Sequence, residues 1–167
     1  MKNFTSFGGF AAHLVRLMAE APTVLHHAAD RAAQVVLDDA RDRVGFYQDR
    51  AGPFAAWAPL AERTMAERVR LGFTPNDPLL RTGELYASLG KTVDGASAVI
   101  GSTSQIMVWQ ELGTDRIPPR PVLGAAGFAQ HVLVMSIAGS TAAAWLAGAN
   151  WRRPSLTALG GMTRGGQ

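Results

Sequence analysis

The stretch Leu85–Val93, with the sequence LYASLGKTV, is followed by Asp94 and Gly95 and then by Ala98–Gly101, with the sequence AVIG. Apolar and β-branched runs on either side of an Asp-Gly pair are typical of two strands joined by a tight turn. The break at Pro75–Pro78, with the sequence PNDP, separates these runs from the chain before them. The sequence therefore predicts a small antiparallel hairpin.

Upstream of the hairpin, apolar residues recur at helical spacing. The first predicted helix ends at Pro22, because proline lacks an N–H and crowds the preceding turn. A longer helix is predicted from an N-cap at Thr23 to Gly45, and a short helix over Ala61–Leu71. The glycine, prolines and aromatic residues of Phe46–Leu60 indicate a loop between the last two helices.

Downstream of the hairpin, Val108–Leu112 is too short an apolar run to distinguish a helical turn from a strand. The proline-rich stretch Ile117–Pro121 predicts an extended path, because proline restricts the residue before it. Helical spacing returns over Phe128–Leu146. The predicted fold class is α+β, with N-terminal helices and a long C-terminal helix packed on a small antiparallel sheet.

No charged residue lies between Arg120 and Arg152. One hypothesis is a helix buried by its own fold or by neighbouring subunits. The alternative is a small membrane-associated protein anchored by an uncharged helix over residues 125–149. Polar residues such as Gln130 and Ser136, and a composition of alanine and glycine in place of leucine and isoleucine, favour the first hypothesis.

The chain has 167 residues, a net charge of +3 and no cysteine. This length predicts a single α+β domain over residues 1–150. Residues 151–167 form a basic, Gly-rich tail that we expect partner contacts to order. No acid follows Asp115, and the tail is either a solvated basic segment or a contact with DNA phosphates or an acidic partner. The residues expected to make that contact are Arg152, Arg153 and Arg164.

The sequence contains no recognisable catalytic motif, so we expect a protein that is not an enzyme and needs no cofactor. Gly90–Thr92 has the sequence GKT, but Leu85 stands where a phosphate-binding loop needs its first glycine. The histidines have no partner at metal-ligand spacing. A hydrolase with a hidden site remains an alternative, and it would require an acid converging on His131. Met1–Glu20 lacks a sustained apolar segment, which predicts synthesis in the cytoplasm.

Three pieces of the chain together resemble a known group of proteins. Leu79–Leu89, with the sequence LLRTGELYASL, precedes the hairpin, and Trp109–Thr114, with the sequence WQELGT, follows it. The third piece is Ile117–Leu123, with the sequence IPPRPVL. In this order they resemble tailed-phage tail-completion and virion morphogenesis proteins, of the HK97 gp10-like and Mu G-like families. Gln110 stands where those families usually have His, and Val122 where they usually have Phe.

The resemblance implies a structural virion protein of the phage head–tail neck, acting in tail completion or as a tail terminator or connector. Such a protein forms a ring, with a hexamer expected, that joins the head connector to the tail tube. The implied partners are further copies of the chain and the neighbouring neck and tail-tube proteins, with non-specific contact to DNA in the lumen and no membrane. The implied location is the virion, after synthesis in the host cytoplasm.

The Pro-Pro-Arg-Pro loop and the turn at Gly113 suit a subunit contact, because a rigid loop loses little freedom on association. Arg120 could bind a carboxylate of an adjacent subunit in bidentate fashion, or it could pair inside its own fold with Glu111. The residues expected at the subunit interface are Glu111, Gly113, Thr114, Arg116, Pro119, Arg120 and Pro121.

Overall fold

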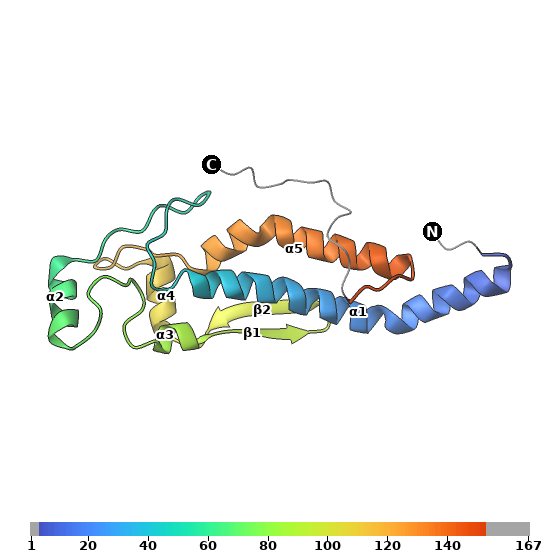
Figure 1. Ribbon diagram of the computed structural model, residues 1–167, viewed down its shortest axis with the longest axis horizontal. Helices are drawn as coiled ribbons and strands as arrows, with labels where there is room; N and C mark the ends of the chain where they lie inside the picture. The colour runs from blue at the N-terminus through green and yellow to red at the C-terminus, as the bar shows by residue number, and fades with distance from the viewer. Residues whose placement is uncertain (1–3, 153–167) are drawn as a thin grey trace. The chain divides into compact units, whose positions relative to one another are not determined.

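The computed structural model describes residues 4–152 and confirms the α+β class (Figure 1). Its elements are α1 (Phe7–Asp42), α2 (Glu62–Arg70), α3 (Glu84–Ala87), β1 (Leu89–Asp94), β2 (Ser97–Ser102), α4 (Gln105–Leu112) and α5 (Leu123–Leu146). The two strands form one antiparallel sheet. The helices at the two ends of the chain are by far the longest elements, with 36 residues in α1 and 24 in α5.

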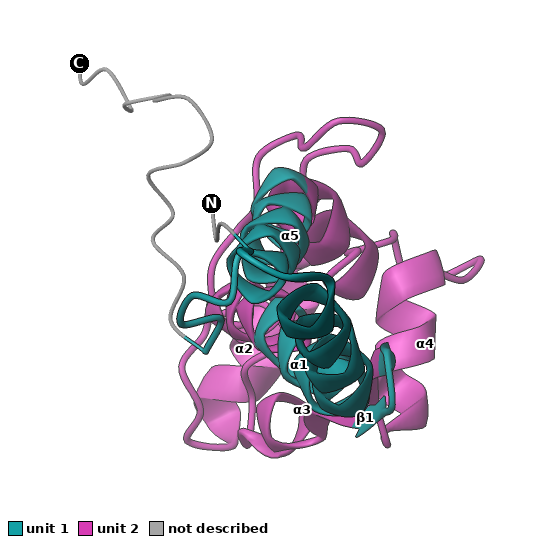
Figure 2. Ribbon diagram, turned by 90° about the vertical axis from the view of Figure 1, so that its right-hand side faces the viewer, with its two compact units in different colours: residues 1–32, 93–98, 132–167 teal, residues 33–92, 99–131 magenta. Residues whose placement is uncertain are grey.

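The chain divides into two compact units (Figure 2). Unit 1 comprises residues 1–32, 93–98 and 132–167, and unit 2 comprises residues 33–92 and 99–131. The first part of α1 and most of α5 therefore belong to unit 1. The single domain expected over residues 1–150 stays a prediction. The basic tail lies, apart from its first two residues, outside the described part of the chain.

The helix predicted to end at Pro22 does not end there, because Pro22 lies inside the continuous helix α1. A proline removes one backbone hydrogen bond and crowds the turn before it, at a cost of about 3 kcal/mol. Leu17 and Val24 lie on either side of Pro22 and are both buried. We attribute the uninterrupted helix to this burial, which a break between the two residues would lose. Thr23 is consequently an interior helical residue and not an N-cap.

The other predicted helices lie close to their expected positions. The main helix ends at Asp42, just before Gly45, which has a φ of +99° and donates its N–H to Pro78 O at 2.8 Å. The helix predicted over Ala61–Leu71 is α2, and Phe46–Leu60 is a loop. The ambiguous run Val108–Leu112 is helical and belongs to α4.

The first predicted strand begins too early, because Leu85–Ala87 lies in the short helix α3 and β1 begins at Leu89. Leu85 and Leu89 are both buried in the core of unit 2. Residues four positions apart share a face in a helix and also in a strand, so the apolar spacing in the sequence does not distinguish the two conformations here. The hairpin turn is formed by Gly95, with a φ of +54°, and Ala96.

Unit 2 contains the hydrophobic core that holds the motif-bearing segments in place. Residues of α1, the loop before α2, α3, β1, α4 and the start of α5 all contribute to it. Its members are Leu37, Ala40, Val44, Trp57, Leu85, Leu89, Met107, Val122 and Ala126. The extended stretch Ile117–Pro121 runs between α4 and α5, as predicted.

Unit 1 has a different surface. Its α5 segment buries Ile137, Ser140 and Thr141, but most of its remaining side chains are exposed and apolar. Its α1 segment is also lined with exposed apolar residues. The large exposed apolar side chains of these two helical segments are Phe7, Phe10, Leu14, Val15, Met18, Leu25, Val132, Leu133, Met135 and Leu146.

Candidate functional site: a basic pocket in unit 2

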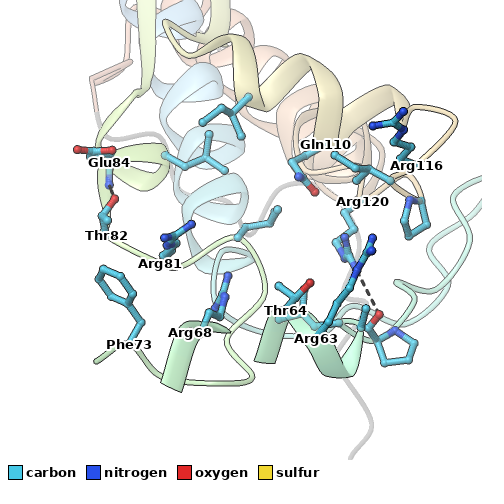
Figure 3. A pocket seen from close by; sticks show the side chains of 18 of the residues that line it. Arg63, Thr64, Arg68, Phe73, Arg81, Thr82, Glu84, Gln110, Arg116 and Arg120 are labelled. Atoms are coloured by element: carbon cyan, nitrogen blue, oxygen red, sulfur yellow. Dashed lines mark hydrogen bonds between the residues drawn. The ribbon is translucent and has the colours of Figure 1, made fainter. Parts of the chain in front are cut away.

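A pocket of about 810 Å³ lies within unit 2 (Figure 3). Five arginines line it, and Glu84 is the one acid among its lining residues. Leu60, Phe73 and Ile106 are among the apolar residues that complete the wall. The arginines are Arg63 and Arg68 of α2, Arg81 of the segment before α3, and Arg116 and Arg120 of the segment between α4 and α5.

Two of these arginines are almost fully buried, with 7% of Arg68 and 5% of Arg120 exposed. Arg68 Nη1 donates to the backbone carbonyls of Asp77 at 2.7 Å and Leu80 at 3.3 Å. Arg120 Nη2 donates to Ala58 O at 2.9 Å. Carbonyl groups satisfy these N–H donors but carry no net charge, so both guanidinium groups keep an unneutralised positive charge.

Burial lowers the pKa of Arg120, because a low-dielectric surrounding disfavours the charged form. The nearby Tyr47 raises this pKa, and the positive charge of Arg68 lowers it. Arginine nevertheless stays protonated at neutral pH. The floor of the pocket therefore holds two mutually repelling cations.

Two polar atoms of the pocket residues are buried without a hydrogen-bond partner, namely Arg120 Nε and Gln110 Oε1. The backbone of these residues is paired, since Arg120 N donates to Gln110 O at 2.6 Å. Most buried polar side-chain atoms in proteins have a partner. The donor on Arg120 and the acceptor on Gln110 are thus two buried polar groups whose hydrogen-bonding capacity the described residues leave unmet.

Glu111 does not pair with Arg120, which corrects one of the two alternatives given by the sequence. Glu111 Oε2 accepts from Val122 N at 2.7 Å and Leu123 N at 3.0 Å, and Oε1 accepts from Gly124 N at 2.7 Å. These N–H groups open α5 and have no partner within the helix. A carboxylate there also interacts favourably with the helix dipole, so the start of α5 is the stronger partner.

The other residues predicted at the interface separate into exposed and buried groups. Thr114, Arg116 and Pro119 are exposed, whereas Arg120 and Pro121 are buried. Gly113 has φ +76° and ψ 175°, a conformation that is essentially restricted to glycine. Only part of the predicted interface is therefore directly accessible to a partner.

Arg152 lies in unit 1 and takes no part in the pocket. Its carbonyl oxygen is 3.0 Å from His27 Nε2, and its guanidinium lies over the ring of Trp151 at 5.0 Å. Arg153 and Arg164 lie outside the described residues.

The sequence did not indicate that Arg63 and Arg68 belong to the site. The two are five positions apart on α2, which is not the spacing of direct neighbours on a helix face. Arg81 lies within the motif-bearing segment Leu79–Leu89, but no sequence pattern indicated a role for it. The only available signal was a short helix rich in arginine close before that segment, and such helices are common on protein surfaces.

The pocket is chemically suited to binding an anion. Guanidinium groups donate hydrogen bonds and carry charge, but they do not act as acid–base catalysts at neutral pH. Among residues 4–152, no group of three or more His, Asp or Glu side chains could hold a metal ion. His131 Nδ1 is 2.6 Å from Phe128 O, and the two rings pack with centroids 5.7 Å apart.

Comparison with protein-family models, with curated proteins and with solved structures found no match in any of the three. Within the described residues, α5 is long and apolar enough to cross a membrane by length and composition, with a mean hydropathy of 1.3. Core helices of soluble proteins meet the same criterion.

Proposed function

We propose that this chain is a structural subunit of the head–tail neck of a tailed-phage particle, and that its copies assemble into a ring. Support comes from the motif-bearing segments, which are distant in sequence but meet around one pocket. Leu79 and Thr82 of the first segment, Gln110 of the second and Arg120 of the third all line it. Because the three motif-bearing segments contribute to one pocket, their order along the chain is consistent with a common functional role.

The main support for assembly into a ring is the exposed apolar side chains of unit 1. Phe7 is 84% exposed, Met18 76% and Met135 70%. Monomeric soluble proteins rarely expose large contiguous apolar patches, and such patches mark sites of association. A closed ring would cover two different faces of every subunit, and the resemblance indicates six copies.

Native mass spectrometry and negative-stain imaging of the purified full chain test this proposal. The expected result is a closed ring with a mass of six chains. A monomer that persists at high micromolar concentration, together with absence of the protein from mature virions, would contradict it.

The runner-up function is a small membrane-associated protein anchored by α5. The helix contains no charged residue, and Val132, Leu133 and Met135 on it are exposed, as lipid contact would require. Gln130 and the many alanine and glycine residues argue against it. Carbonate extraction of expressing cells separates the two, because a neck subunit is recovered in the soluble fraction and an anchored protein stays with the membranes.

The proposed role is not enzymatic and involves no cofactor. The hydrolase alternative required an acid beside His131, and the contacts of this histidine are with Phe128. The neighbouring neck and tail-tube proteins remain the proposed partners. Contact of Arg152, Arg153 and Arg164 with DNA in the ring lumen also remains a proposal.

A further inference from the structure

The basic pocket of unit 2 has an imbalance of charge that residues 4–152 do not neutralise. It contains five arginines and one acid. The ion pairs that the structure shows, Arg16–Glu20 and Arg43–Asp39, involve none of these arginines. Buried charges are normally paired, because an unpaired charge in a low-dielectric interior is costly. An arriving anion would supply the missing partner.

The position of the arginines fits a ligand that enters the pocket. Two of the five arginines, Arg68 and Arg120, are buried. The other three are exposed, namely Arg63, Arg81 and Arg116. Arg120 also holds an unpartnered Nε, and Gln110 an unpartnered Oε1. A carboxylate that enters among these side chains would supply the negative charge that the guanidinium groups lack, and carboxylates accept charge-assisted hydrogen bonds from arginine.

The shape and lining of the pocket favour a peptide over a nucleic acid. The phosphates of a duplex lie on a convex surface and would reach the exposed arginines but not the buried residues Arg68 and Arg120. Single strands bind through stacking on aromatic side chains. Phe73 is the one aromatic residue of the lining, and the guanidinium of Arg81 lies over its ring at 5.2 Å. Apolar residues such as Leu60, Ile106 and Ile117 instead suit apolar side chains next to a carboxylate.

We propose that this pocket is a socket for an acidic peptide segment of a neighbouring protein chain, with a Glu or Asp flanked by apolar residues. This peptide-binding proposal rests on the proposed neck function, because a subunit of the neck has neighbouring chains that can supply the acidic segment. It also revises the expectation for Arg120, which would meet a partner carboxylate at the base of a pocket and not at the tip of a loop.

The test measures binding of a fluorescein-labelled hexapeptide of alternating leucine and glutamate to the full chain, by fluorescence anisotropy at low salt. Changing two of the three exposed pocket arginines together, Arg63→Gln and Arg116→Gln, is expected to weaken binding by about tenfold, since each removes a charge-assisted contact. The matched control, Arg50→Gln with Arg70→Gln, removes the same charge from exposed positions outside the pocket. We expect that control to change binding by less than about twofold.

The buried Arg120 is left unchanged, because its loss would also remove the hydrogen bond to Ala58 and could unfold the chain. Equal weakening by the pocket and control variants would mean diffuse electrostatic attraction and would overturn the proposal. So would equal binding of a hexapeptide with glutamine in place of glutamate. Tighter, pocket-dependent binding of inorganic phosphate or of a short single-stranded oligonucleotide would assign the site to phosphate instead.

This result and the test of the ring are independent. If the chain forms a hexameric ring but its pocket does not bind the acidic peptide, the peptide-binding proposal is wrong and the proposed neck function is unaffected. If the chain is a monomer but binds the peptide through the pocket arginines, the ring proposal is wrong and the peptide-binding proposal is supported.

Discussion

Unit 1 and unit 2 differ in how much of their apolar surface they bury. Unit 2 gathers residues from six segments into one hydrophobic core, and hydrogen bonds from the start of α5 to Glu111 hold the segment between α4 and α5 in place. Unit 1 buries a narrow set, including Leu17, Val24 and Ile137, and leaves Met18 and Met135 mostly exposed. The difference is that unit 2 has a hydrophobic core and a basic pocket, whereas unit 1 leaves large apolar side chains exposed.

The largest expected effect is in the core of unit 2. Leu89 is 2% exposed, and Leu89→Ala removes apolar contacts and leaves a cavity. We expect the free energy of unfolding to fall by about 2–5 kcal/mol, measured by urea denaturation. Val99→Ala, in the same hairpin at a site that is 69% exposed, is the control and should have little effect. Equal losses in the two variants would mean that unit 2 has no self-sufficient core.

The next effect concerns the turn that follows α4. A Cβ atom at Gly113 would lie 3.0 Å from Ile117 O and from Pro119 N, and the backbone there has a φ of +76°. Gly113→Ala should therefore lower the free energy of unfolding by about 1–3 kcal/mol. Gly90→Ala is the matched control, because a Cβ there meets nothing within 4 Å. If Gly113→Ala does not change the free energy of unfolding, the backbone of this turn can shift to accommodate the added Cβ atom.

A smaller effect is expected at the start of α5. Glu111→Gln keeps the shape of the side chain but removes the charge that three backbone N–H groups share. We expect a loss of about 1–2 kcal/mol in the free energy of unfolding. Glu67→Gln, at an exposed position of α2, controls for the change in net charge. If both variants unfold at the same urea concentration, Glu111 does not anchor the helix.

The smallest effect on unfolding is expected in unit 1, where Met18→Lys and Met135→Lys replace exposed side chains. The free energy of unfolding of the monomer should change by less than about 0.5 kcal/mol. The ring, in contrast, should be lost, because a charge would replace apolar contact area at the interface. Native mass spectrometry measures this, with His26→Lys as the control that adds a charge on α1 without removing an apolar group. Intact rings in both methionine variants would place the interface elsewhere.

Local sequence patterns located most of the elements correctly. Apolar periodicity located the helix near residues 61–71, the Asp-Gly turn located the hairpin, and the prolines located the extended Ile117–Pro121. These patterns failed at Pro22, where a local rule for ending helices was outweighed by the burial of Leu17 and Val24. They also failed at Leu85, where a helical turn precedes the strand. Both errors arise because packing against distant segments decides between local conformations of similar energy.

The candidate site was only partly predictable. The motif-bearing segments pointed to Arg116 and Arg120, and both line the pocket. The contribution of Arg63 and Arg68 was not visible, since it depends on α2 folding against segments that follow it in the chain. The partner of Glu111 was also unpredictable, because three backbone N–H groups compete with Arg120 only once the start of α5 is in place.

By itself, the sequence determined the α+β class, the two-stranded hairpin, the long C-terminal helix, and the location of the motif-bearing segments between Leu79 and Leu123. These follow from local periodicity, turn residues and prolines, which act over a few residues. The tertiary structure alone decided that the arginines of α2 join those of the later segments around one pocket, with Arg68 and Arg120 buried and without a carboxylate. Burial and charge balance depend on which distant segments meet, and that information is not contained in any single stretch of the chain.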